Sequence, residues 1–160
     1  IYNQTMQRDN AEEYYYFQEE FYKAIHDYLK GNYQVFYATL DDQIIAVSII
    51  LYANKQIHYH LSGSLSEYRS FAPTNLLLYE VALWGNQEGY KTFHLGGGLG
   101  SGNDNLYKFK AAFNRKSGLQ FSIGKQIFNQ ALYNQLVEER LAEDPNFDLE
   151  SKYFPLYRAK

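Results

Sequence analysis

The stretch that decides the fold reads TFHLGGGLGSGNDNLYKFKAAF, from Thr92 to Phe113. A short apolar run from Phe93 to Leu95 leads into a glycine-rich loop, and a helical pattern begins after Asp104. The loop contains Gly96, Gly97, Gly98, Gly100 and Gly102. Glycines let another group approach the backbone closely, and the first turn of the following helix offers unpaired N–H donors. The order strand, glycine loop, helix therefore predicts a place that can hold a substrate.

The spacing of these glycines does not fit the two common phosphate-binding templates. No Gly-x-Gly-x-x-Gly run occurs, and Gly102 is followed by Asn103 rather than by Lys and then Ser or Thr. Glycines alone are weak evidence for a site. The alternative is a flexible connection between a strand and a helix.

The helix after the loop places a lysine near its apolar face. At about 100° per residue, Leu106, Phe109 and Phe113 fall on one arc, and Lys110 lies only about 40° from Leu106. Lys108 points to the opposite side. Burying an ammonium alone costs several kcal/mol, so Lys110 must reach water, pair with a carboxylate or face a polar cleft. Lys110 is therefore a candidate catalytic residue, and a lysine that reaches solvent from the edge of the core is the alternative.

The composition bounds the class of protein. The 160 residues suit one domain with a substantial core, and we expect this domain over residues 1–145, with an irregular tail over residues 146–160. The absence of cysteine excludes a thiol nucleophile, a disulfide framework and thiolate metal sites. A net charge of -3 gives no overall attraction to nucleic acid. The start at Ile1, without a secretory or membrane-spanning segment, indicates a cytoplasmic fragment or processed chain, with a location at the inner face of the membrane as an option.

The hydrophobic pattern predicts alternating helices and strands. The expected elements, in order, are a helix over residues 11–29, strands over 35–40, 44–52 and 57–61, a buried helix from Pro73 to about Gly89, a strand over 93–95, a helix after Asp104, strands within 119–128 around Gly124, and a helix over 129–141. The first three strands are joined by short polar turns and form an antiparallel meander. The order predicts an α/β (α+β) fold with a mixed, mostly antiparallel central sheet flanked by helices.

Three histidines and one arginine are further candidates. His58 and His60 share one face of a strand, and with His94 they could form a metal site, but carboxylate partners at suitable spacing are missing and we expect no metal. Arg69 precedes the buried helix, where it could pair with a phosphate or a carboxylate. A surface arginine bonded to its own loop is the alternative.

The sequence resembles a known family in several short motifs. They are Tyr59-His60-Leu61-Ser62-Gly63-Ser64, Ala72-Pro73-Thr74-Asn75-Leu76-Leu77-Leu78-Tyr79-Glu80, His94-Leu95-Gly96-Gly97-Gly98, and Leu106-Tyr107-Lys108-Phe109-Lys110 followed by Phe113. In order and spacing they resemble the acyltransferase fold of the GCN5-related N-acetyltransferases (GNAT), and within it the Fem branch of peptidoglycan-bridge aminoacyltransferases. The likeness covers nearly the whole chain.

The resemblance implies transfer of an activated acyl group to an amine. In the Fem branch the donor is aminoacyl-tRNA and the acceptor is a peptidoglycan precursor, and no tightly bound cofactor is implied. It implies that Phe109 and Lys110 act at the aminoacyl end of the donor, and we take Lys110, Phe109 and Tyr107 as candidate catalytic residues. The implied substrate-binding residues are Arg8, His60, Arg69, Asn75, Gly96, Gly97 and Gly98. Fem enzymes usually carry two such domains, and a chain of this length matches the second, so an upstream domain is expected.

Two other readings remain open. An acyl-CoA-dependent N-acetyltransferase acting on a small or protein amine is one, although the Arg/Gln-x-x-Gly-x-Gly/Ala loop that grips the pyrophosphate of coenzyme A is absent before the buried helix. A non-catalytic binding half of a tandem-domain protein is the other.

Aminolysis of an ester or thioester needs a deprotonated amine, a positioned acyl carbon and a donor at the developing oxyanion. We assign Lys110 to the oxyanion or leaving group and Phe109 to the acyl pocket. We assign the backbone of Gly96–Gly98 to holding the acyl or acceptor chain. The general base stays open among Tyr107, His60, His94 and Glu80.

Overall fold

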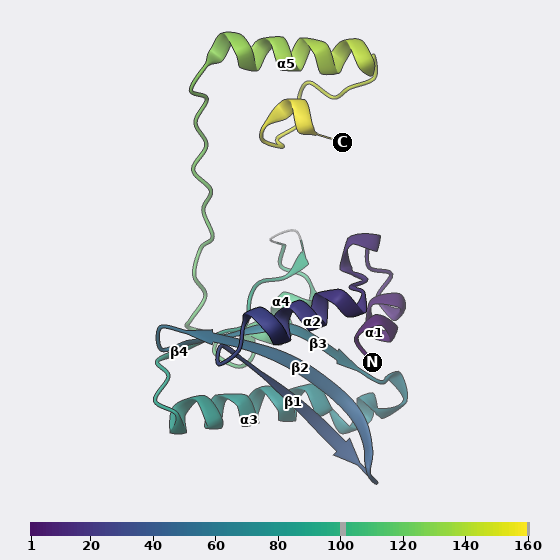
Figure 1. The fold of residues 1–160 in the computed structure, drawn as a ribbon, viewed down its shortest axis with the longest axis vertical. Helices are drawn as coiled ribbons and strands as arrows, with labels where there is room; N and C mark the ends of the chain where they lie inside the picture. The colour runs from purple at the N-terminus through teal and green to yellow at the C-terminus, as the bar shows by residue number, and fades with distance from the viewer. Residues whose placement is uncertain (100–101, 160) are drawn as a thin grey trace. The chain divides into compact units, whose positions relative to one another are not determined.

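The computed structural model describes residues 1–99 and 102–159. The chain forms two compact units, residues 1–117 and residues 118–160, each of which is described by itself. Unit 1 contains the sheet and the helices around it, and unit 2 contains one long helix and the C-terminal segment (Figure 1).

Unit 1 is built on a four-stranded sheet in the order β1-β2-β3-β4. The strands are β1 (Tyr33–Leu40), β2 (Gln43–Ala53), β3 (Gln56–Ser64) and β4 (Thr92–His94). The first three are antiparallel and β4 pairs parallel to β3, which confirms the mixed, mostly antiparallel sheet. Both hairpins have two-residue loops with positive φ, at Asp41–Asp42 and Asn54–Lys55, as type I′ turns require.

A β-bulge in β3 decides which side chains share a face. Ile49 pairs with Leu61 and Ile50 pairs with Tyr59, so His60 is the extra residue. Before the bulge, Ile57 joins the buried core with Ile50. After it, Leu61 lies with Ile49 on the opposite face of the sheet.

Helix α3 (Pro73–Gln87) covers one face of the sheet (Figure 1). Val81 on α3 meets Ile50 and Ile57 in the central core cluster, and Trp84 packs against it. Gly85 lets the helix approach the sheet, because a Cβ there would lie 2.6 Å from Cδ1 of Ile57. Pro73 occupies the first turn and Gly89 follows the last with φ +76°, as predicted.

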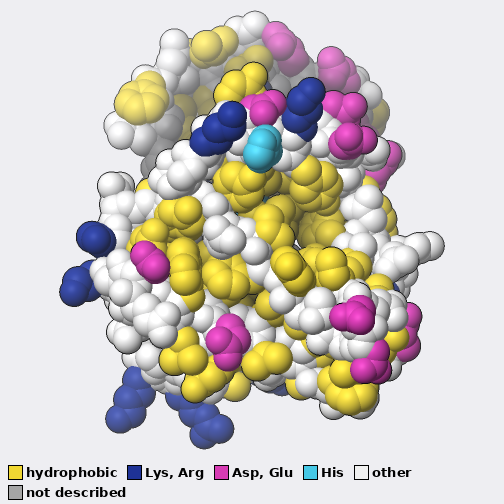
Figure 2. Space-filling view, turned by 60° about the horizontal axis from the view of Figure 1, so that its bottom comes forward, with side chains coloured by type: hydrophobic (Ala, Val, Ile, Leu, Met, Phe, Trp, Pro, Cys, Tyr) yellow, Lys and Arg dark blue, Asp and Glu magenta, His cyan; other side chains and the backbone are white. Residues whose placement is uncertain are grey.

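The expectation that α3 is nearly buried all round is wrong. Leu76, Tyr79 and Leu83 are exposed, because only one side of the helix contacts the sheet. Figure 2, turned to bring the lower side of Figure 1 forward, shows hydrophobic side chains gathered in the middle of this face with charged side chains around them.

The opposite face of the sheet is covered by α1 (Tyr2–Arg8) and α2 (Glu19–Tyr28). Helix α1 lies in a segment of the sequence that has no clear hydrophobic period, so it was not predicted. The helix predicted over residues 11–29 is shorter, because a 3-10 turn at Glu13–Tyr15 and the extended backbone of Gln18 precede it. Phe17 accounts for the misleading period: it stacks on Phe21 at 4.0 Å between ring centroids without belonging to the same helix.

The glycine loop follows β4, and α4 (Asn105–Ala111) follows the loop with Asp104 as its N-cap, as predicted. Gly100 lies outside the described residues. No helix in the part of the chain that the structure describes is long and apolar enough to cross a membrane.

Unit 2 contains α5 (Gln130–Glu143), which confirms the last predicted helix with slightly longer bounds. The strands predicted within residues 119–128 are wrong: this segment forms neither helix nor strand, and Leu119 and Phe121 are exposed. A strand needs a neighbouring strand for its backbone hydrogen bonds, and none pairs with this segment in residues 1–99 and 102–159. The C-terminal segment is irregular apart from one 3-10 turn at Leu156–Arg158. The backbone N–H of Leu156 donates a hydrogen bond to the hydroxyl of Tyr133 on α5 (2.9 Å).

Candidate active site

The glycines after β4 meet different surroundings. Gly96 has φ +75°, and a Cβ there would lie 3.3 Å from Nζ of Lys110. A Cβ at Gly98 would collide with the carboxylate of Asp104 and lie 2.7 Å from the carbonyl oxygen of Gly102. A Cβ at Gly97 would have no atom within 4 Å. Neighbouring atoms of the chain therefore explain why residues 96 and 98 are glycines. Gly97, in contrast, borders open space beside the loop.

Asp104 ties the glycine loop to helix α4. Its carboxylate accepts hydrogen bonds from Tyr107 N (2.7 Å) and Leu99 N (2.8 Å). These two bonds, in that order, are the main causes that hold the pKa of Asp104 below its ordinary value. The carboxylate therefore stays ionised and caps the helix.

Lys110 turns its ammonium into the loop. Its Nζ donates a hydrogen bond to the carbonyl oxygen of Gly97 (2.8 Å) and lies 5.7 Å from the centre of the Tyr59 ring. The side chain is half-buried, and burial lowers the pKa of Lys110, while the charge of Asp104 raises it. The structure thus holds a cation at the loop, near the arc where helical periodicity placed it.

Strands β3 and β4 separate beside this cation. Their pairing ends at His58 and His94, where β4 ends, while β3 continues to Ser64. In the described residues no strand lies beside the remaining edge of β3 on this side. The arrangement can accept an extended group next to Lys110 and Gly97.

The two histidines at the end of the pairing are in direct contact. Nδ1 of His58 lies 2.9 Å from Nδ1 of His94, and the rings stack with centroids 5.0 Å apart. The ring of His60 lies 6.1 Å from that of His58. Burial is the first cause that lowers the pKa of His58, followed by His94 and His60. Burial also lowers the pKa of His60.

The three histidines do not make a metal site. No group of three or more His, Cys, Asp or Glu side chains within residues 1–99 and 102–159 is arranged to hold a metal ion.

The structure brings some of the predicted site residues together and leaves others apart. Lys110 donates to the carbonyl oxygen of Gly97 beside Gly96, and Asp104, beside Gly98, accepts from the backbone N–H groups of Leu99 and Tyr107. Phe109 packs edge-on against Phe113 with ring centroids 5.5 Å apart.

Arg8, Arg69 and Asn75 lie elsewhere on unit 1. The guanidinium of Arg8 bonds Asp9 (2.9 Å) and the carbonyl oxygen of Ser64 (2.8 Å). Arg69 and Asn75 are exposed at the start of α3, and no side-chain contact in the described residues joins them to Lys110.

Sequence reasoning missed Tyr59 as a partner of Lys110, and the Nδ1 contact between His58 and His94. The first depends on how α4 docks on the sheet. The second depends on the register of β3 and β4, which puts the paired residues His58 and His94 on the same face of the sheet.

Two hollows lie on the α2 side of unit 1. One, of about 330 Å³, is largely apolar and is lined by Tyr2, Tyr22, Ile25, Tyr33, Val35, Val47, Ile49, Leu61 and Ser62. Burial raises the pKa of Tyr2 to about 12, so its hydroxyl stays protonated.

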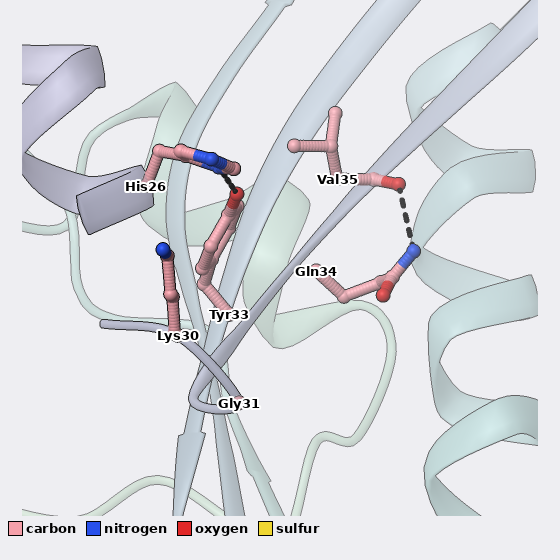
Figure 3. A pocket seen from close by; sticks show the side chains of 6 residues that line it. All are labelled: His26, Lys30, Gly31, Tyr33, Gln34 and Val35. Atoms are coloured by element: carbon pink, nitrogen blue, oxygen red, sulfur yellow. Dashed lines mark hydrogen bonds between the residues drawn. The ribbon is translucent and has the colours of Figure 1, made fainter. Parts of the chain in front are cut away.

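The other hollow, of about 400 Å³, is wide open and lies between the end of α2 and the start of β1 (Figure 3). There His26 Nδ1 and the hydroxyl of Tyr33 share a hydrogen bond (2.8 Å). Although it is the larger, none of its lining residues belongs to the glycine loop or α4. We therefore place the candidate site at Lys110.

Comparisons with known proteins identify the family and the fold. A family model described as an acetyltransferase (GNAT) domain matches residues 1–111, which include β3, β4, the loop and Lys110. Among solved structures, an aminoglycoside acetyltransferase from an uncultured soil metagenomic sample, determined in complex with sisomicin, has a TM-score of 0.58 and 10% sequence identity, covering 80% of this chain and 86% of that chain. This likeness shows a shared fold. A search of curated protein sequences gives no match. Since the family model spans more than half of the residues, the chain belongs to the GNAT acetyltransferase domain family and carries an acyltransferase fold.

Proposed function

We propose that this chain transfers an acyl group from an acyl-CoA thioester to a primary amine. The observation that carries the proposal is the position of Lys110, whose Nζ lies 2.8 Å from the carbonyl oxygen of Gly97 where β3 and β4 separate. The donor class follows from the acetyltransferase family, and the amine from N-acyl transfer as its general reaction. The solved relative was determined with an aminoglycoside, which supports a polar amine as the acceptor.

The proposed role of Lys110 is to stabilise negative charge. Attack of an amine on the thioester carbonyl places charge on oxygen, and a fixed cation in a half-buried site stabilises that charge more than water does. One N–H of the ammonium bonds Gly97, which fixes its direction and leaves two N–H donors for the oxyanion. Gly97 has open space at its Cα, so the acyl chain can approach the backbone there.

Thiol release tests this proposal directly. Purified protein is incubated with acetyl-CoA and a panel of amines that includes aminoglycosides and polyamines, and free thiol is detected with a disulfide reagent. The protein contains no cysteine, so the reagent reports only released coenzyme A. Lys110→Ala is expected to lower kcat/KM by about 10²-fold or more, the usual effect of losing an oxyanion donor.

Lys108→Ala is the matched control, because Lys108 is an exposed lysine on the same helix. It is expected to keep kcat/KM within about threefold of the wild type. Thiol release by Lys110→Ala at a rate within threefold of Lys108→Ala would remove Lys110 from the mechanism.

A second candidate function is Fem-like aminoacyl transfer from aminoacyl-tRNA to a peptidoglycan precursor. Two features favour it: the Phe109–Lys110 pair on the helix after the glycine loop, and the sequence Arg69-Ser70-Phe71-Ala72-Pro73-Thr74 where coenzyme A users carry a glycine-rich pyrophosphate loop. Under this reading Arg69 and Asn75 bind the acceptor or the end of the tRNA.

Parallel assays with labelled acetyl-CoA and with charged tRNA separate the two donors. Binding of tRNA weakens steeply with salt, because phosphate contacts release counterions. Transfer only from charged tRNA, lost at high salt and not inhibited by coenzyme A, would establish the Fem-like function. Stable binding of an acceptor without turnover of either donor would indicate a non-catalytic half of a larger protein.

A further inference from the structure

The contact between His58 and His94 fixes where their protons lie. At 2.9 Å, two Nδ1 atoms can face each other only if one carries hydrogen and the other offers a lone pair. In a neutral pair, the ring that donates from Nδ1 has an unprotonated Nε2. This Nε2 is ready to accept a proton.

The same contact allows the neutral pair to take up only one additional proton. When the donating ring is protonated at Nε2 it becomes a cation, and its hydrogen bond to the neutral partner becomes charge-assisted and stronger. A second proton would place two Nδ1–H groups face to face. The contact therefore holds a single hydrogen between the two Nδ1 atoms.

The groups that face His58 favour its neutral form. His60 lies on the same strand with its ring 6.1 Å from that of His58, and Lys110 faces His58 from α4. Asp104, at the start of α4, acts on Lys110 rather than on the histidines. Burial, together with these neighbours, lowers the pKa of His58, so His58 stays in the base form near pH 7.

We propose that the His58–His94 pair is the proton acceptor that activates the amine, an inference that rests on the proposed acyl transfer. The pair lies where β3 and β4 separate, and His94 precedes Gly96 by two residues. The oxyanion cation on α4 faces His58, so it and the proton acceptor lie beside the same strand ends. His58 and His94 act together, since each fixes the tautomer of the other.

Every proton in the proposed acyl transfer can be followed from ammonium to products. An incoming ammonium, R–NH₃⁺, gives one proton to the free Nε2 of the pair, and the amine nitrogen then attacks the acyl carbon. The new C–N bond forms while the carbonyl electrons move onto oxygen beside Lys110. Collapse of this intermediate breaks the C–S bond, and a second amine proton goes to the thiolate. The products are amide and free thiol, and the pair releases its proton to water.

A pH profile of thiol release tests the proposal. His58→Asn and His94→Asn are each expected to lower kcat/KM at pH 7 by about 10²-fold, the usual contribution of a positioned base. The deficit should shrink as the pH rises toward the pKa of the amine substrate, because solvent then supplies the free amine. A variant that only disturbs packing would lose activity by the same factor at every pH.

His26→Asn is the control, since His26 also bonds a ring partner, Tyr33, but lies at the open hollow away from the loop. It should keep the wild-type profile. Turnover by the wild type, with unchanged profiles in both His58→Asn and His94→Asn, would overturn the proton-acceptor role and leave the proposed function standing. A wild type that turns over no thioester would overturn the proposed function and this role with it.

A second measurement uses the wild-type protein and does not depend on a variant folding. Ring ¹⁵N shifts at pH 8 should show one of the two rings protonated at Nδ1 and the other unprotonated at Nδ1. Two rings that both carry hydrogen on Nε2 would overturn the pair.

Discussion

Gly98 has no side chain, and this leaves room for the carboxylate of Asp104. A Cβ at this position collides with the Asp104 carboxylate and approaches the Gly102 carbonyl oxygen to 2.7 Å, whereas a Cβ at Gly97 meets nothing within 4 Å. Gly98→Ala should therefore break the bonds from Asp104 to Leu99 and Tyr107 and lower the Tm by roughly 2–6 °C, the range expected for overpacking in a chain of this size.

Gly97→Ala is the matched variant, measured by the same thermal melts. It should leave the Tm within about 1 °C of the wild type, because surface changes without contacts seldom matter to stability. If the acyl chain approaches the loop there, Gly97→Ala lowers thiol release without changing the Tm. Equal Tm losses for the two alanine variants would contradict the described loop packing.

The stability of the protein depends on pH through the carboxylate of Asp104, and the lowered pKa sets the sign of this dependence. Its folded pKa is lowered, chiefly by the hydrogen bond from Tyr107 N, below the ordinary value of 3.8. The stabilisation by ionised Asp104 is therefore complete above the ordinary value and is lost as the pH falls through the lower folded pKa. The Tm gap between wild type and Asp104→Asn should be constant from pH 7 to about pH 5 and should close as the pH falls below the ordinary carboxyl value. A gap that widened on acidification would contradict this assignment.

At the residue scale, the sequence predicts what depends on local geometry. Helical periodicity placed Lys110 near the apolar arc of α4, and the pattern after the loop identified Asp104 as the helix start. The Nδ1 contact of His58 with His94 depends on the register of two strands 36 positions apart in the chain. Register between such strands is set by packing across the whole sheet, so it could not be derived from either segment alone.

Helix α3 offers a test at the element scale, because two of its leucines differ only in the face they occupy. Leu78 is 1% exposed against the sheet, whereas Leu76 is 54% exposed on the outer side. Leu78→Ala should lower the free energy of unfolding by about 2–4 kcal/mol, since it leaves a cavity in a packed core. Leu76→Ala should change it by less than about 1 kcal/mol.

Chemical denaturation monitored by circular dichroism measures both variants. Equal losses would mean that the outer face of α3 is covered in the folded protein. The outcome therefore also reports on the hydrophobic face seen in Figure 2.

The elements that the sequence predicts well are those whose partners lie next to them in the chain. The hairpins of β1, β2 and β3 were placed because polar two-residue turns separate their apolar runs. The predicted helix over residues 11–29 failed in its first half, because aromatic side chains such as Phe17 follow the packing of α2 and not a continuous helical period. The alternating residues Leu119, Phe121 and Ile123 have the period of a strand, but a period does not supply a hydrogen-bonding neighbour.

At the scale of the whole molecule, the order of elements was enough to predict the class of fold. Antiparallel strands followed by a buried helix and a parallel strand require a mixed sheet with helices on both faces, and the described part of unit 1 has this arrangement. The family match ends at residue 111, and the compact unit that contains the sheet ends at residue 117. The fold and the candidate site therefore belong to the same part of the chain.

This boundary predicts where a protease cuts first. Residues 118–129 form neither helix nor strand, and Leu119, Phe121 and Phe128 are 91%, 77% and 90% exposed. Chymotrypsin cleaves after such residues and needs an extended, accessible backbone, whereas Phe36 and Tyr52 are packed against the core of unit 1. A low dose should therefore cut first within residues 118–129, and mass spectrometry should find new C-termini at Leu119, Phe121 or Phe128. The remaining fragment should keep the β-sheet circular dichroism signal and, because Lys110, His58 and His94 all lie within it, should keep the ring ¹⁵N shifts of the histidine pair. First cuts within residues 33–64, or loss of the sheet signal at the rate of the first cut, would show that unit 1 does not hold its fold without residues 118–159.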